Sequence, residues 1–304
     1  MSKQHLMGNR SCDPTGRINK EDDMIVVTGA TGQLGRQVVE RLMEMVSPST
    51  IAVSVRDPEK AAGMAAAGIE VRKSDFTDHD SMVRAFTGAD KVLIISTRGP
   101  DVVAEHLGAV AAAAAAGVPH VVYTSGTQAE GTATASVHKQ TEDAIRSAGM
   151  TYTFLRNNLY ADVLVREVLS AIEAGVLSSP AGDGRVGAVT RGDCATVAAS
   201  VLATSGHENR VYDITGPDSV GWLDLAAVAS EVAGHDVPYA PVSFDELTAG
   251  PNAVMADYYG GISRGGYNIV SGAVLEITGR PPVSAATFVR RTVREALAHR
   301  AAGV

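Results

Sequence analysis

Three glycines spaced three residues apart mark the first segment whose chemistry follows from its residue types. Gly29, Gly32 and Gly35 lie in VVTGATGQLGRQVVERL, residues 26–42, between a β-branched run and a segment of helical period. At a strand-to-helix turn, the first glycine permits a sharp turn, the second lets a pyrophosphate approach the backbone, and the third lets the helix lie against the strand. Free N–H groups at the helix start then face the phosphates. The segment predicts a dinucleotide-binding loop. Its other members are Thr31, Gln33 and Leu34.

The segment SVRDPEK, at the end of the second expected strand, bears on which dinucleotide is bound. An acid at this position favours NAD by binding a ribose 2′-hydroxyl, whereas an arginine accommodates the 2′-phosphate of NADP. Asp57 precedes a proline and so reads as a helix N-cap. That leaves Arg56 free, with Lys60 as a second cation. We therefore expect NADP(H) to be preferred, with NAD(H) as the alternative; a merely solvated Arg56 stays open.

The elements that must position these residues follow from an alternation of short β-branched runs and longer helical segments. Near-continuous hydrophobic strands indicate a parallel sheet covered on both faces. Right-handed crossovers make it a doubly wound α/β Rossmann fold. The expected strands are 25–27, 51–55, 69–73, 91–95, 120–125 and 152–156, and the expected helices include 33–46, 58–68, 79–86, 101–117 and 137–149.

The alternation sets the expected domain organisation. Residues 1–23 have no apolar periodicity and are expected to be a disordered tail or leader. Residues 24–157 form the predicted NAD(P)-binding core. Beyond about residue 158 the alternation loosens, with short strands at 184–189 and 210–216 and a terminal helix. Residues 158–304 are therefore expected to be mainly a smaller substrate-binding lobe, interleaved with the core.

Composition restricts the partners. The formal net charge of −8 argues against a nucleic-acid or anionic-membrane surface, and no run of 18 apolar residues suggests a transmembrane span. Two cysteines, Cys12 and Cys194, are too few for a disulfide framework, which favours the cytoplasm. The histidines lack metal-ligand spacing, so no metal is predicted. The sequence does not decide between a monomer and a homodimer.

Several segments together resemble one family. The segments are TGATGQLG, VRDPEK, SDF (74–76), YTFLRNNLYAD (152–162) and TRGDCA (190–195). They are similar to the NmrA-like branch of atypical short-chain dehydrogenases, and within it to bacterial NAD(P)H:quinone oxidoreductases and triphenylmethane dye reductase. The resemblance runs from Met24 nearly to the C-terminus.

The resemblance implies further site residues. It places the adenine edge at Asp75 and Phe76, puts Ser96 and Thr97 beneath the cofactor, and sets the stretch from Asn157 to Tyr160 beside the nicotinamide and the substrate. Asparagine is depleted in strands, so Asn157 and Asn158 also suggest polar groups that line a site. The members of that stretch are Asn157, Asn158, Leu159 and Tyr160.

The family's Tyr-x-x-x-Lys pair has no counterpart in ATASVHKQTEDAI, residues 133–145. Counted back from Glu142 in steps of four, His138 takes the lysine position and Thr134 the tyrosine position. An alkyl hydroxyl is far less acidic than a phenol, so Thr134 cannot replace it. His138 is either held by Glu142 or another surface pairing, or it contacts the nicotinamide ribose or relays a proton. It is the one catalytic candidate.

A site without tyrosine can still reduce acceptors that need little acid catalysis. The resemblance implies NAD(P)H-dependent reduction of quinones or similar electrophilic aromatic molecules by direct hydride transfer. Tyr123 and Tyr160 are candidates to stack such a small aromatic substrate, although each could equally be core, and for Tyr123 the core role is favoured. The alternative function is a non-catalytic NADP(H) sensor that regulates a protein partner.

Overall fold

The β-branched runs of the N-terminal half form one parallel sheet. The computed structural model describes residues 23–127, 133–244 and 256–301. The sheet order is β3-β2-β1-β4-β5-β6-β9, and all of its neighbouring strands are parallel. This order is that of a doubly wound Rossmann fold with one added strand, which confirms the predicted α/β class. The strands are β1 (Ile25–Thr28), β2 (Ile51–Val55), β3 (Glu70–Lys73), β4 (Lys91–Ile94), β5 (His120–Gly126), β6 (Thr151–Asn157) and β9 (Arg210–Ile214).

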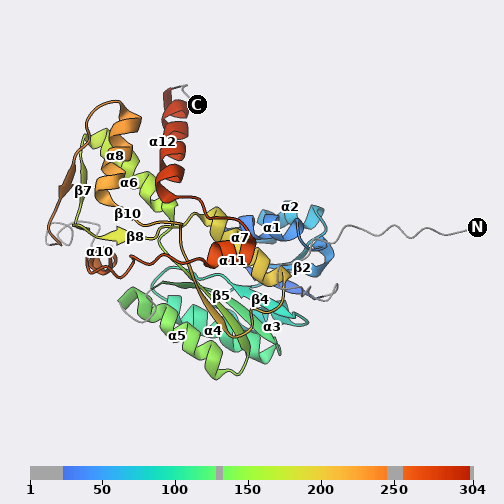
Figure 1. Ribbon diagram of the computed structural model, residues 1–304. Coiled ribbons are helices and arrows are strands. Elements are labelled where there is room, and N and C mark those ends of the chain that lie inside the picture. Colours follow the sequence, from blue (N-terminus) through green and yellow to red (C-terminus); the bar gives the residue numbers. More distant parts are fainter. Residues whose placement is uncertain (1–22, 128–132, 245–255, 302–304) are drawn as a thin grey trace, which may run out of the picture.

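Helices cover both faces of the sheet (Figure 1). One face carries α1 (Gln33–Met43), α7 (Arg191–Ala203) and α11 (Ala273–Thr278), whose apolar residues share a core cluster with β1 and β2. The other carries α3 (His79–Phe86), α4 (Val102–Ala115) and α5 (Ala133–Ser147), which form a second cluster. Both faces of the central strands are covered, so β1, β2 and β4 are buried at every position rather than alternating. The edge strands β3 and β9 are partly exposed. The short elements η1 (Pro48–Thr50), η2 (Pro58–Ala61) and α2 (Ala62–Ala66) flank β2.

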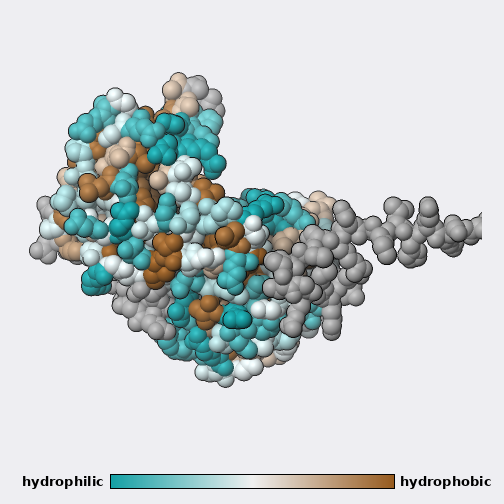
Figure 2. Space-filling model, in the orientation of Figure 1, coloured by the Kyte–Doolittle hydropathy of each residue, from teal (hydrophilic) through white to brown (hydrophobic). Residues whose placement is uncertain are grey.

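A smaller lobe lies beside the carboxyl edge of this sheet (Figure 1). Its helices share a third buried cluster that includes Trp222, Leu164 and Val289. In Figure 2 the hydrophobic residues on the visible face form small separate groups among polar ones. No helix in the described ranges has the length and apolar character needed to cross a bilayer. The lobe contains α6 (Ala161–Ala174), α8 (Trp222–Ala233), α10 (Ala256–Ser263), α12 (Ala285–Ala301) and the strand pairs β7 (Leu177–Ser179) with β11 (Tyr239–Pro241) and β8 (Arg185–Val186) with β10 (Val220–Gly221).

The second half of the chain contributes more to the sheet than its sequence suggests. The expected strand at 210–216 is β9, which pairs with β6 as the seventh strand, and α7 and α11 cover the sheet. The expected strand at 184–189 shrinks to the two residues of β8. The division at residue 157 stays a prediction. The predicted tail, 1–23, lies outside the described residues except for its last position.

Candidate active site

The glycine loop follows β1 and leads into α1. Gly29 has a φ of +61°, a left-handed conformation that favours glycine, and its carbonyl accepts a hydrogen bond of 2.9 Å from the N–H of Gly32. A Cβ atom on Gly35 would lie 2.3 Å from the Gly29 oxygen and 2.7 Å from Ala30 Cα. Gly35 is therefore required for the contact between helix and strand. A Cβ on Gly32 would have the Gly29 oxygen at 3.2 Å as its nearest neighbour, so this position is open.

The first turn of α1 presents backbone donors. Gly32 is the N-cap residue, and no side chain caps the helix. The first N–H groups of a helix have no intrahelical acceptor, which here concerns Gln33, Leu34 and Gly35. The Leu34 side chain is buried in the core, so only its backbone faces outward, while Gln33 is exposed. The Thr31 carbonyl accepts from Arg36 Nε at 2.9 Å. These features fit a pyrophosphate cradle.

The charged residues that follow β2 differ in their contacts. Asp57 Oδ1 accepts a hydrogen bond of 3.2 Å from the Glu59 N–H and so caps η2, which Pro58 begins. Lys60 Nζ lies 3.5 Å from Asp57 Oδ2, an exposed ion pair that leaves the lysine mobile. Arg56 is exposed and makes no hydrogen bond or ion pair within the described parts of the chain. The expected role of Arg56 and Lys60 toward a 2′-phosphate stays a prediction.

Asp75 and Phe76 follow β3 beside this cation. Asp75 Oδ1 accepts hydrogen bonds from the N–H and the hydroxyl of Thr77, at 2.9 and 2.8 Å. Those bonds, and the positive charge of Arg56, hold the pKa of Asp75 below its usual value despite partial burial. Phe76 is half-buried against the α3–α4 side of the core. The turn is thus built by Asp75, and the role of both residues toward adenine stays a prediction.

Ser96 and Thr97, after β4, connect three elements. The Ser96 N–H donates to Thr124 Oγ1 of β5 at 2.9 Å, and the Thr97 N–H donates to His106 Nε2 of α4, also at 2.9 Å. Thr97 Oγ1 donates to Glu105 Oε2 at 2.6 Å. The Thr97 side chain is therefore engaged within the protein, and the expected place of Ser96 and Thr97 beneath a cofactor stays a prediction.

The two asparagines at the end of β6 differ. Asn158 is 3% exposed; its Nδ2 donates to the carbonyl of Tyr267 at 3.1 Å, and its Oδ1 accepts from the Leu159 N–H at 2.7 Å. That side chain fastens the 267–269 segment, and the role of Asn158 beside the nicotinamide stays a prediction. Asn157 Nδ2 donates to Tyr160 Oη at 3.3 Å, while the buried Asn157 Oδ1 lacks a partner in the described structure. Asn157 can accept a hydrogen bond from a bound molecule.

Tyr160 is half-buried, and the Arg191 guanidinium carbon lies 4.6 Å from the centre of its ring. Arg191 is itself held by Asp162 at 2.8 Å. One ring face of Tyr160 is thus occupied, and burial raises the pKa of its hydroxyl. Leu159 is buried in the lobe cluster. Stacking of a substrate on Tyr160 stays a prediction.

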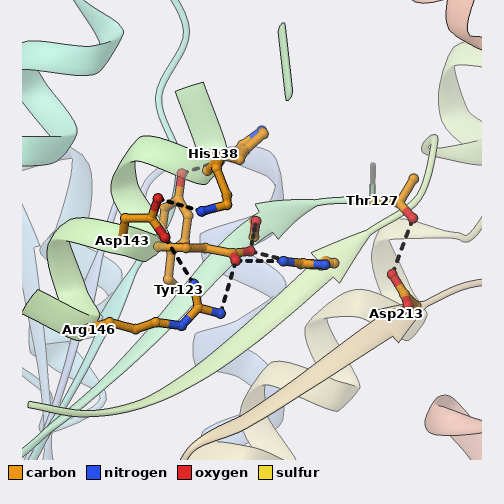
Figure 3. Close-up of polar contacts among 10 residues, drawn as sticks. Tyr123, Thr127, His138, Asp143, Arg146 and Asp213 are labelled. Carbon is orange, nitrogen blue, oxygen red and sulfur yellow. Dashed lines mark hydrogen bonds and ion pairs between the residues drawn. The ribbon is translucent and has the colours of Figure 1, made fainter. Parts of the chain in front are cut away.

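Tyr123 cannot stack a substrate, which corrects that expectation. Its side chain is completely buried in β5, and its ring contacts the rings of His106 and His138, which also contact each other. The core interpretation accounts for the ring, but the hydroxyl has a specific contact: Tyr123 Oη lies 2.8 Å from His138 Nδ1 (Figure 3). It also lies 3.2 Å from His106 Nδ1.

His138 is not held by Glu142, contrary to one of the two expectations. The Glu142 carboxylate is buried and accepts from Arg156 Nε and Nη2, at 2.9 and 2.7 Å, and from Ser125 Oγ at 2.7 Å. The His138 ring instead contacts Tyr123 and lies over Gly126, where a Cβ atom would be 2.9 Å from His138 Cδ2. Thr134, the other residue of the expected stripe, has a side chain outside the described part of the structure.

Burial sets the charge of His138. It lowers the pKa of His138 to about 4, and the neighbouring His106 and Arg98 act in the same direction while Glu142 opposes them. His138 is therefore neutral at pH 7. Arg98, exposed in the loop after β4, also lowers the pKa of Tyr160 and Tyr258 against the larger effect of their burial. Arg98 thus lies near His138 of α5, Tyr160 at the start of α6 and Tyr258 of α10.

Sequence reasoning missed three of these residues. His106 occupies an apolar helix face, where the sequence gives no sign of a partner. Tyr258 has a buried hydroxyl without a partner in the described structure, and it comes from the lobe, far away in sequence. Arg98 follows Ser96 and Thr97 directly, so its place at the strand end was the one available signal.

Metal ligands and a reactive thiol are the remaining candidates for chemistry. No group of three or more His, Cys, Asp or Glu side chains within the described residues could hold a metal ion. Cys194 is buried in α7, and burial raises the pKa of its thiol well above the usual value. A thiol in that state is a poor nucleophile.

The chain is similar in sequence and in structure to known proteins. The model of the NmrA-like family matches residues 21–258. Quinone oxidoreductase 2 of Escherichia coli is 36% identical over 282 residues, which cover 88% of this chain and 97% of that protein. An E. coli NADPH-dependent quinone oxidoreductase crystallised with NADPH superposes with a TM-score of 0.85 at 35% identity, covering 88% of this chain and 99% of the other. Triphenylmethane reductase of Citrobacter sp. with NADP(H) gives 0.81 at 38% identity, covering 89% and 99%.

Proposed function

This chain belongs to the NmrA-like family, and from that premise we propose that it is an NAD(P)H-dependent oxidoreductase that reduces quinones or similar electrophilic aromatic acceptors by direct hydride transfer. The observation that carries the proposal is the likeness to quinone and dye reductases over nearly the whole chain, lobe included. A non-catalytic sensor needs only the cofactor half to be similar. The likeness in the lobe therefore favours the enzyme.

NADP(H) is the cofactor that the residues fit best. The glycine loop and the first turn of α1 would hold the pyrophosphate, and Arg56 would meet the 2′-phosphate. The unpartnered Oδ1 of Asn157 would accept from the carboxamide or ribose at the nicotinamide end. Relatives crystallised with NADPH and NADP(H) support this choice. When bound, the reduced nicotinamide supplies the hydride.

The absence of a Tyr-x-x-x-Lys pair belongs to the same proposal. A quinone becomes aromatic when it accepts hydride, so it needs little help from an acid, and holding it over the nicotinamide is the main requirement. A neutral His138 fits this requirement because it cannot serve as a charged acid at pH 7. The site should be poor with ordinary alcohols and ketones.

Steady-state oxidation of NADPH against a panel of quinones, triphenylmethane dyes and simple carbonyl compounds tests the function. We expect turnover with quinones and cationic dyes and little with aliphatic ketones. NADPH binding without turnover of any quinone or dye in the panel would instead identify a sensor.

Cofactor preference has its own prediction. Arg56→Ala should weaken NADPH binding by roughly 1–3 kcal/mol, the range for charge-assisted hydrogen bonds, and change NADH binding little. Fluorescence titration of both cofactors measures this. Arg41→Ala is the matched control, because Arg41 is an exposed arginine on α1 paired with Glu44. Equal losses for NADPH and NADH in Arg56→Ala would remove the assignment.

His138 should contribute modestly. If it is neutral, His138→Ala should lower turnover of a benzoquinone by less than about tenfold, the effect of one uncharged hydrogen bond, whereas a general acid contributes about 10²–10⁴-fold. Because burial holds the His138 pKa near 4, turnover should show no titration of this group between about pH 5.5 and 8. His79→Ala, an exposed histidine of α3, is the control. A hundredfold loss together with a vanished titration near pH 6.5 would make His138 the acid.

A further inference from the structure

A chain of hydrogen bonds connects the loop after β4 to His138, and its first bond sets the tautomer of His106. The backbone N–H of Thr97 lies 2.9 Å from His106 Nε2. A backbone N–H can only donate, so His106 Nε2 must accept. Burial lowers the pKa of His106 to about 4, which keeps the ring neutral at pH 7. A neutral ring that accepts at Nε2 carries its proton on Nδ1.

The second bond directs the hydrogen of Tyr123. His106 Nδ1–H faces two oxygens at 3.2 Å, Thr141 Oγ1 and Tyr123 Oη, and it can only donate to them. The Thr141 hydroxyl already donates to the Val137 carbonyl at 2.9 Å. Burial raises the pKa of Tyr123, so its hydroxyl keeps its proton. The nearest acceptor for that proton is His138 Nδ1, at 2.8 Å.

The third bond fixes His138. A ring that accepts at Nδ1 and is neutral carries its proton on Nε2. His138 Nε2 makes no hydrogen bond to the described residues and lies over Gly126, at the carboxyl edge of the sheet beside Asn157. The ionisable groups around the ring are Tyr123 of β5, His106 of α4, Glu142 of α5 and Arg98 of the loop after β4. The packing thus presents one N–H donor of fixed identity at the carboxyl edge of the sheet.

We propose that the Thr97 N–H, His106 and Tyr123 are positioning groups that hold His138 as the neutral Nε2–H tautomer, and that Nε2–H donates a hydrogen bond to the acceptor oxygen of a bound quinone. The inference rests on the proposed function for its last step alone. If this series of hydrogen bonds only stabilised the core, each of its polar groups would have a partner within the protein. His138 Nε2 bonds to no described residue and is not one of the buried unpartnered atoms of the described structure, so its N–H is open to a bound molecule at the strand end.

The reaction balances with this donor. The quinone takes a hydride, two electrons with one proton, from NADPH, which becomes NADP⁺. Negative charge then develops on the quinone oxygen, which the His138 N–H stabilises by hydrogen bonding without giving up its proton. Solvent supplies the second proton to complete the hydroquinone. A fixed donor requires no reorganisation during the step, which is how oriented dipoles favour a transition state.

The tautomer can be measured directly by long-range ¹H–¹⁵N NMR of the histidine rings, with His138 assigned by the signal missing in His138→Ala. We expect wild-type His138 to be neutral at pH 7 with its proton on Nε2. Tyr123→Phe removes the donor to Nδ1 and should produce a mixture of tautomers. Tyr152→Phe is the matched control, because the Tyr152 ring stacks on Phe154 and its hydroxyl bonds to no described residue. A protonated Nδ1, or an imidazolium, in the wild type would overturn the proposal.

Kinetics connect the tautomer to the reaction. Tyr123→Phe should lower kcat for a benzoquinone, but by less than His138→Ala, which stays below about tenfold, because part of the tautomer mixture keeps the Nε2–H donor. The double variant should be no slower than His138→Ala alone, because both changes act on one interaction. NADPH affinity should stay at the wild-type value, and the melting temperature of Tyr123→Phe should fall slightly, because a buried hydroxyl that contacts two histidines is lost. Independent, multiplying losses in the double variant would contradict the positioning role.

The two experiments separate the possible failures. The NMR result does not depend on turnover, so the expected tautomer in a protein that reduces no quinone would retain the hydrogen-bond chain and reject the proposed function. The wrong tautomer in an active quinone reductase would reject the positioning role alone.

Discussion

Replacing Gly35 by alanine is expected to destabilise the protein and abolish NADPH binding. The added Cβ atom would lie 2.3 Å from the Gly29 carbonyl oxygen and 2.7 Å from Ala30 Cα, both of them backbone atoms. Backbone atoms cannot move aside as the end of a flexible side chain can, so α1 must shift away from β1. Overpacking of this kind costs typically about 1–3 kcal/mol and more where backbone is involved. Because α1 carries the first-turn donors, the displacement also removes the phosphate site.

Chemical unfolding and NADPH titration of the same sample measure both effects. Gly63→Ala is the control, since a Cβ atom on Gly63 in α2 meets nothing within 4 Å. That substitution should leave stability unchanged or raise it by up to about 1 kcal/mol through helix propensity. A Gly35→Ala protein as stable as wild type would show that the helix does not lie as close to the strand as described.

Gly32→Val should abolish dinucleotide binding and leave the fold intact. The nearest neighbour of its Cβ atom is the Gly29 oxygen at 3.2 Å, a contact that small shifts relieve. The valine side chain would then fill the space through which a pyrophosphate approaches the first turn of α1. We expect a melting temperature close to that of wild type and no measurable affinity for NADPH. Normal affinity would mean that the loop is not the phosphate site.

The fold could be predicted because its signals are local. Six strands of the sheet are indicated by short apolar runs, and the glycine loop is indicated by the spacing of its three glycines. The place of β9 could not be predicted, because the pairing of Arg210–Ile214 with β6 depends on the path of the lobe rather than on its own residues. Likewise Asn157 and Asn158 are adjacent and alike in sequence. The Tyr267 carbonyl, more than 100 residues away in sequence, accepts a hydrogen bond from Asn158, whereas Asn157 Oδ1 has no partner among the described residues.

The catalytic candidate shows the same limit. Helical spacing placed His138 and Glu142 on one face, which suggested a pair. In the structure Arg156 of β6 and Ser125 of β5 donate hydrogen bonds to the Glu142 carboxylate, and the Tyr123 hydroxyl contacts His138. These partners come from neighbouring strands, so spacing along one helix carries no information about them. Residue types therefore identified His138, and tertiary packing decided its partner and its charge.

Hydride transfer from NADPH to a quinone can be followed with NADPH deuterated at C4 of the nicotinamide. The protein is mixed with one equivalent of the labelled cofactor and an excess of benzoquinone, and loss of NADPH absorbance and formation of hydroquinone are followed together. We expect one hydroquinone per NADPH, with the reaction slowed when the transferred position carries deuterium. Labelled NADPH that is bound but stays unoxidised in the presence of the quinone would contradict it.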